Sequence, residues 1–99
     1  MQITGPMCRA ARALTQISRT VLAEASGVAK ADIRTFESGG GDLSGACCGA
    51  LKHALEQAGA VFLEEGDMGV GVRLRFTRKD VRQLNRLEGE GGAIGEDDV

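Results

Sequence analysis

Hydrophobic residues in the first half of the chain recur at the three- and four-residue spacing of amphipathic helices. Cys8, Ala11 and Leu14 lie on one face of a first helix. Thr4 is its expected N-cap, and Pro6 is tolerated in the opening turn. The same spacing predicts three further helices, which are expected at residues 19–26, 29–37 and 43–58.

A tight turn at Gly27 joins the second and third helices, since glycine adopts positive φ at little cost. Ala23 is small enough for another helix to pass closely. The side chains expected to face the core from these two helices are Val21, Leu22, Ala25, Val28, Ile33 and Phe36.

The fourth helix is expected to take Asp42 as its N-cap and to end before Gly59. Gly45 and Gly49 each weaken its first half by about 1 kcal/mol relative to alanine. Its expected apolar stripe consists of Cys48, Leu51, Leu55 and Ala58.

The period changes to two residues after the fourth helix. Residues 60–64 predict a strand, residues 65–69 a turn, and residues 70–76 a half-buried strand in which apolar and polar residues alternate. Because a lone hairpin is marginal in water, this one must pack on the helices or pair with another chain.

The C-terminal part predicts one more helix and a tail. Thr77 and Asp80 resemble a capping box at the start of a helix over residues 78–87. Residues 88–99 are acidic and rich in glycine, and are expected to be disordered. Residues 1–87 are therefore expected to form a single, mainly α domain of four helices, a β-hairpin and a short C-terminal helix.

Composition limits the size of the core and the classes of function. The chain has 99 residues, of which 15 are glycine and three are phenylalanine, with no tryptophan or tyrosine. So small a core favours burial against a second copy, which would make a homodimer. No stretch is long and apolar enough for a membrane span, and no secretory signal is present. Three cysteines, two of them adjacent, do not form a disulfide framework, so a cytoplasmic location is expected.

The net charge of −2 is unevenly distributed. Residues 1–86 carry 12 basic and nine acidic groups, whereas residues 87–99 carry five acidic groups and no basic one. Residues 73–86 hold six basic groups against Asp80 alone. This segment either contacts phosphates or an acidic partner, or is simply solvated, and the acidic tail could shield it.

The segment LAEASGVAKADIRTFESG, from Leu22 to Gly39, resembles the Cro/CI-type (XRE) helix-turn-helix family. CRAARAL at residues 8–14 extends the match, while ALKHALEQAGAVF at 50–62 and GVRLRF at 71–76 resemble a subgroup with an appended hairpin. The resemblance covers roughly residues 3–87. It implies a four-helix domain whose recognition helix, here residues 29–37, can enter the major groove of DNA.

The resemblance also implies where contacts to DNA or to a partner would lie. Arg19 stands at the start of the first motif helix, where the family contacts the DNA backbone. Arg73 and Arg75 share the outward face of the second strand and add a basic patch. The positions of the recognition helix that usually make contacts hold Lys30, Ala31, Asp32, Arg34 and Thr35.

Departures from the family pattern weaken the case for DNA binding. Ala29 replaces a capping serine or threonine, Asp32 stands where threonine or serine is common, and the loop at 38–42 lacks basic residues. Residues 29–50 hold two basic and three acidic groups. Since phosphate neutralisation dominates DNA affinity, a reading face of negative charge is a poor surface for DNA.

The resemblance, taken with these departures, implies a bacterial transcription regulator that inhibits a transcription activator by protein contact, as antiactivators of mobile genetic elements do. The alternative is a small dimeric repressor that binds promoter DNA through residues 29–37. An enzyme is not expected, because no nucleophile or carboxylate is arranged around His53. No cofactor is expected, and the cysteines lack the spacing of a zinc site.

Overall fold

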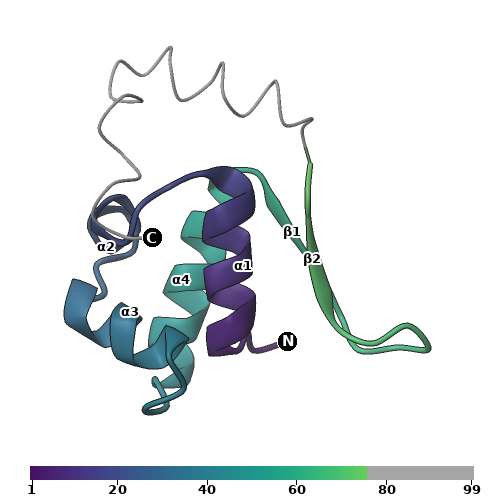
Figure 1. Cartoon of the computed structure of the whole chain (residues 1–99), viewed down its shortest axis with the longest axis horizontal. Helices are drawn as coiled ribbons and strands as arrows, with labels where there is room; N and C mark the ends of the chain where they lie inside the picture. The colour runs from purple at the N-terminus through teal and green to yellow at the C-terminus, as the bar shows by residue number, and fades with distance from the viewer. Residues whose placement is uncertain (76–99) are drawn as a thin grey trace.

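The computed structural model describes residues 1–75; the expected final helix and tail, and the capping residues Thr77 and Asp80, lie outside this part. The described chain is mainly α, with four helices followed by a two-stranded antiparallel hairpin (Figure 1). No helix in it could cross a membrane. The elements are α1 (Gly5–Thr15), α2 (Arg19–Ser26), α3 (Lys30–Glu37), α4 (Gly45–Gln57), β1 (Ala60–Leu63) and β2 (Gly71–Leu74).

Side-chain hydroxyls begin three of the helices. Thr4 caps α1, as predicted, by accepting a hydrogen bond from the Met7 amide at 3.3 Å. Ser18 caps α2, which has the predicted bounds and ends at Gly27 with φ of 79°. α3 starts without a side-chain cap, because Ala29 occupies the capping position.

The predicted start of α4 is wrong. Ser44, not Asp42, is the N-cap, and its hydroxyl accepts from the Cys47 amide at 3.1 Å, so the helix begins at Gly45. At the other end, Ala58 is the half-buried C-cap rather than part of the buried stripe.

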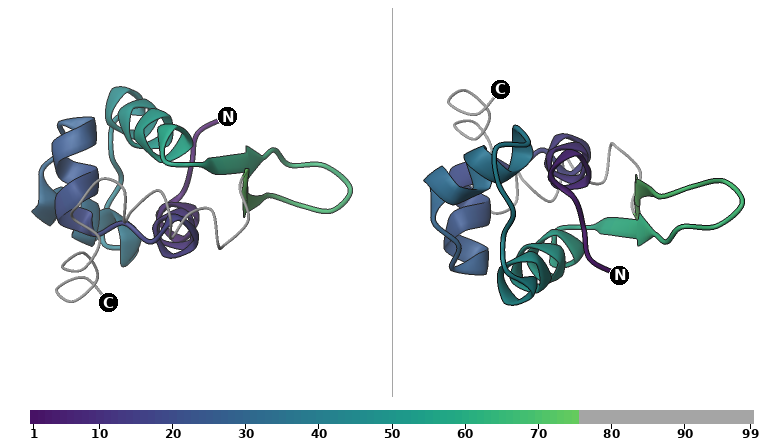
Figure 2. Two further views of the ribbon diagram at one scale, coloured as in Figure 1. Left: turned by 90° about the horizontal axis from the view of Figure 1, so that it is seen from above. Right: turned by 90° about the horizontal axis from the view of Figure 1, so that it is seen from below.

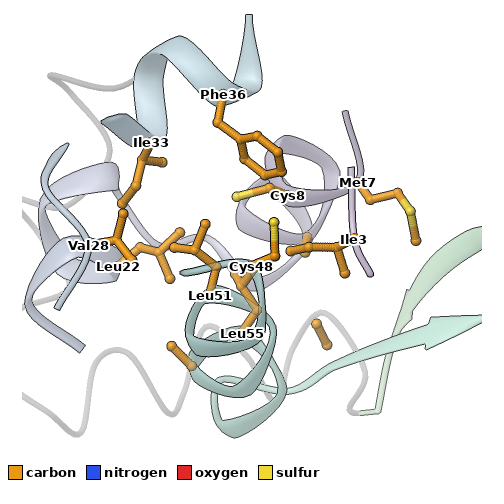
Figure 3. Packing of buried hydrophobic residues seen from close by; sticks show 13 residues of the cluster. Ile3, Met7, Cys8, Leu22, Val28, Ile33, Phe36, Cys48, Leu51 and Leu55 are labelled. Atoms are coloured by element: carbon orange, nitrogen blue, oxygen red, sulfur yellow. The ribbon is translucent and has the colours of Figure 1, made fainter. Parts of the chain in front are cut away.

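The core lies between the four helices, where α1 and α2 each pack on α3 and α4 (Figure 3). Leu22 of α2 is fully buried, as predicted. Ala25 is exposed, contrary to the prediction, because α2 is rotated so that Ala23 packs against the core instead. Val21 is only partly buried for the same reason. The other large side chains that are fully buried are Cys8, Thr15, Ile33, Cys48, Leu51 and Leu55.

One face of the hairpin packs on the helices, and its turn projects away from them. Ala60 pairs with Leu74, and Phe62 with Val72, and Phe62 and Val72 pack on the core. Both strands are shorter than predicted in the described part, since β1 ends at Leu63 and Val70 lies before β2. α1 and α4 lie between α3 and the hairpin, whose connecting loop extends away from the helices (Figures 1 and 2).

We expect Gly5→Ala to destabilise the fold, because a Cβ at residue 5 would collide with the carbonyl oxygen of Phe36. Overpacking of this kind costs about 1–3 kcal/mol in the free energy of unfolding, measurable by urea denaturation. Gly49→Ala is the matched control, because a Cβ there meets nothing within 4 Å. It should stabilise α4 by about 1 kcal/mol. Equal effects of the two substitutions would contradict the close packing of α1 on α3.

Candidate functional site

A buried ionic cluster lies beneath the surface formed by α2 and α3. Glu37, the last residue of α3, is only 6% exposed. Arg12 of α1 binds it through two parallel hydrogen bonds, Nη2 to Oε1 at 2.7 Å and Nε to Oε2 at 2.8 Å. Nε of Arg19, at the start of α2, donates to Oε1 at 3.1 Å. One carboxylate thus links three helices.

Two further contacts complete the surroundings of this carboxylate. Cys8 donates its thiol hydrogen to Oε2 of Glu37 at 3.2 Å, and Nη1 of Arg12 donates to the Ile17 carbonyl at 3.3 Å. Burial by itself would raise the pKa of Glu37, but the hydrogen bonds from Arg12 and Cys8 and the positive charges outweigh it and lower that pKa. Burial raises the pKa of Cys8, as does the bond to Glu37, so the thiol stays protonated.

The cluster changes the charge of the predicted contact surface. The structure holds Arg19 against Glu37, with only 14% of its side chain exposed. Glu37, counted from the sequence as one of three acidic groups near the recognition helix, is buried and paired with arginine. The other charged side chains of α2 and α3 are Lys30, which is half-buried, and Glu24, Asp32 and Arg34, which are exposed. Two of these four are basic and two are acidic, so their charges balance.

The predicted residues of α3 lie together on its solvent-exposed side. Ala31, Asp32, Arg34 and Thr35 are all exposed, and Lys30 is partly so. The Thr35 hydroxyl donates to the Ala31 carbonyl at 3.1 Å. The exposed side of α3, defined by these five residues, is called the α3 face below. It combines two small side chains and a hydroxyl with charges of both signs.

Arg73 and Arg75 belong to a different surface. Arg73 is exposed on β2 and Arg75 is exposed directly after it, and Nη2 of Arg75 donates to the carbonyl of Glu56, near the end of α4, at 2.7 Å. Because α1 and α4 separate the hairpin from α3 (Figure 1), the predicted site residues divide between two parts of the molecule. Within residues 1–75 there is no group of three side chains suited to a metal ion.

Sequence reasoning missed the role of Arg12 and the exposure of the hairpin. Arg12 follows Cys8 by four residues and so shares its buried face, which was the available signal. Met68 is 96% exposed in the connecting loop, and Leu63 and Val70 are 42% and 48% exposed.

The chain matches no protein-family model and no curated protein.

We expect Glu37→Gln to destabilise the protein by about 3–5 kcal/mol, because Arg12 would remain buried without its counter-charge. Urea denaturation measures this loss. Arg9→Gln, at an exposed position of the same helix as Arg12, is the control and should change stability by less than about 0.5 kcal/mol. A Glu37→Gln protein as stable as the control would show that the ionic cluster does not hold the helices together.

The lowered pKa of Glu37 predicts a loss of stability in acid. A carboxyl whose pKa is lower in the folded than in the unfolded state stabilises the fold above its unfolded pKa, here near 4.5. This contribution disappears as the pH falls through the folded pKa. The free energy of unfolding, measured from about pH 7 to about pH 3, should therefore fall at the acid end. The fall should be smaller in Glu37→Gln, and equal profiles would contradict the assignment.

Proposed function

We propose that this chain is a non-enzymatic transcription regulator of the Cro/CI helix-turn-helix type, without a cofactor, that binds a transcription activator through its α3 face and inhibits it. The observation that carries the proposal is the balance of charge on this face. Burial of Glu37 and the pairing of Arg19 leave Lys30 and Arg34 against Glu24 and Asp32.

A balanced surface suits a protein partner better than the DNA backbone. Non-specific DNA affinity comes almost entirely from basic side chains that neutralise phosphates. The start of α2 supplies little positive charge to a phosphate, since Arg19 is hydrogen-bonded to Glu37. The loop at 38–42 supplies an exposed carboxylate, Asp42, and no basic group. Phosphates along such a surface would meet about as much repulsion as attraction.

The shape of the α3 face also fits a protein contact. Ala31 and Thr35 are small and exposed, and Gly39, Gly40 and Gly41 follow directly after the helix. Small residues allow close approach of another backbone, and mixed charges provide specificity at a modest energetic cost. A helix of the activator could lie against this surface.

One observation favours DNA binding as the second candidate function. Arg34 and Thr35 lie exposed on a short helix that follows a tight turn, and Lys30 is at the start of this helix. In a helix-turn-helix protein these positions reach base edges and phosphates in the major groove. In this case the protein would be a repressor, and Arg34 would be the side chain suited to guanine.

Two measurements separate the candidates. We expect no sequence-specific binding to promoter DNA of its own gene at about 50 mM or 200 mM salt, as measured by fluorescence anisotropy.

A photo-crosslinking residue in place of Ala31 should trap a transcription activator in the host cell, because the α3 face is the contact surface. The same residue in place of Ala10, which is exposed on α1, should not.

Specific DNA binding that weakens steeply with salt, and is lost in Arg34→Ala, would overturn the protein-contact proposal and favour the repressor. Equal crosslinking from positions 31 and 10 would also contradict it, because the α3 face would then have no special role.

A further inference from the structure

We propose that the cavity between the N-terminus of α1 and the loop after α3 receives an apolar side chain of the transcription activator, and that Asp42 binds a basic side chain next to it. This assignment rests on the proposed function and adds the chemistry of the partner segment. Three features support it, which are the size of the cavity, its single charged lining residue and its position beside the α3 face.

The cavity has an apolar interior. Its volume is about 500 Å³, within the range of about 300–1,000 Å³ that is usual for ligand pockets. Ile3 and Phe36, both buried in the core, lie beneath it, and Leu43 is half-buried at its side. Gly39 and Gly41 line it without side chains that could fill it. An apolar group that displaces water from this surface is therefore favoured.

Asp42 gives the cavity its charge. Among the described residues that line the cavity it has the only ionisable side chain, while Gln2 and Thr4 supply neutral polar groups. Asp42 is exposed, and within residues 1–75 its carboxylate has no ion pair and no hydrogen bond. A basic side chain of a partner would meet this carboxylate beside an apolar surface, where partial loss of water strengthens the attraction.

The N-terminus of α1 does not reverse this preference. A helix N-terminus carries only about half a positive charge, and it attracts anions through its free amides. Here Pro6 has no amide hydrogen, and the Met7 amide donates to the Thr4 hydroxyl. Asp42 therefore supplies the only full charge of the described lining, which favours a basic over an acidic group.

The cavity adjoins the α3 face, so one partner segment can contact both. Phe36 lines the cavity and follows Thr35 of the α3 face. The Thr35 methyl group lies 3.7 Å from the point where a Cβ of residue 41 would stand. Binding energy at protein interfaces is concentrated in a few anchors that fill pockets. An anchor in this cavity would add affinity that the small side chains of the α3 face cannot supply.

Peptide probes test this chemistry in the full chain. N-acetyl-leucyl-arginine amide, at about 1–10 mM, should shift the amide signals of Phe36, Gly39 and Gly41 in two-dimensional NMR spectra. N-acetyl-leucyl-glutamate amide should bind about tenfold more weakly, because Asp42 repels it. Asp42→Lys should reverse the preference. Asp67→Lys, the same substitution in the hairpin loop, is the matched control and should bind both peptides like the wild type.

Gly41→Leu tests the space in the cavity. A Cβ at residue 41 meets only the Thr35 methyl group, at an ordinary contact distance, so the fold should tolerate the substitution. The added side chain should narrow the cavity and weaken binding of N-acetyl-leucyl-arginine amide about tenfold. Gly66→Leu, where a Cβ meets nothing within 4 Å, is the control. Circular dichroism confirms that each variant retains its helices.

Equal binding of the two peptides, no shift at about 10 mM, or a preference that Asp42→Lys leaves unchanged would overturn the assignment. So would an activator that is crosslinked from position 31 as strongly in Asp42→Lys as in the wild type, although the proposed function would then stand. Failure of the proposed function shows instead as specific promoter binding or as equal crosslinking from positions 31 and 10, and neither measurement involves the peptides.

Discussion

The arrangement of the helices depends on one buried carboxylate. Glu37 ends α3, and its two oxygens receive hydrogen bonds from Arg12 of α1, Arg19 of α2 and the thiol of Cys8. A carboxylate withdrawn from water costs several kcal/mol unless such partners satisfy it. Two of the partners lie on α1 and the third begins α2, so the charge is satisfied only when α1, α2 and α3 adopt their observed positions. The cluster therefore fixes the orientation of α3, because loss of one partner would leave a buried charge unpaired.

The same interaction determines the charge of the surface above it. Arg19 stands at the position where a helix-turn-helix protein contacts the DNA backbone. Here its guanidinium donates a hydrogen bond to Glu37. Glu37 in turn no longer opposes DNA, since it is buried and neutralised. These two changes cancel in the charge of the surface, and Asp32 and Asp42 remain as the acidic groups that a DNA backbone would meet beside Lys30 and Arg34. The proposed contact with a protein is thus supported by fewer acidic residues than the count over residues 29–50 indicated.

Local chemistry could be predicted from the sequence, whereas contacts distant in the sequence could not. Thr4 and Gly27 mark helix ends because a hydroxyl and a residue with positive φ act within a single turn. Asp42 failed as a cap because Ser44 competes for the same role two residues later. The pairing of Arg12 with Glu37 spans 25 residues, and no local sequence pattern predicts it. The rotation of α2 that exposes Ala25 depends likewise on how the helices pack, and the projection of the hairpin on how the strands pack on α1 and α4.

The hairpin and the α3 face lie on opposite sides of α1 and α4 (Figure 1). A homodimer joined on the hairpin side would carry two identical α3 faces, one on each copy, on the far side of α1 and α4 from that contact. Two such faces suit a palindromic operator, and they suit a dimeric activator equally well. Symmetry therefore does not distinguish the two candidate functions. The charge of the α3 face favours the proposed protein contact, because a protein surface can complement Lys30, Asp32 and Arg34 individually, whereas a phosphate backbone presents only one sign of charge.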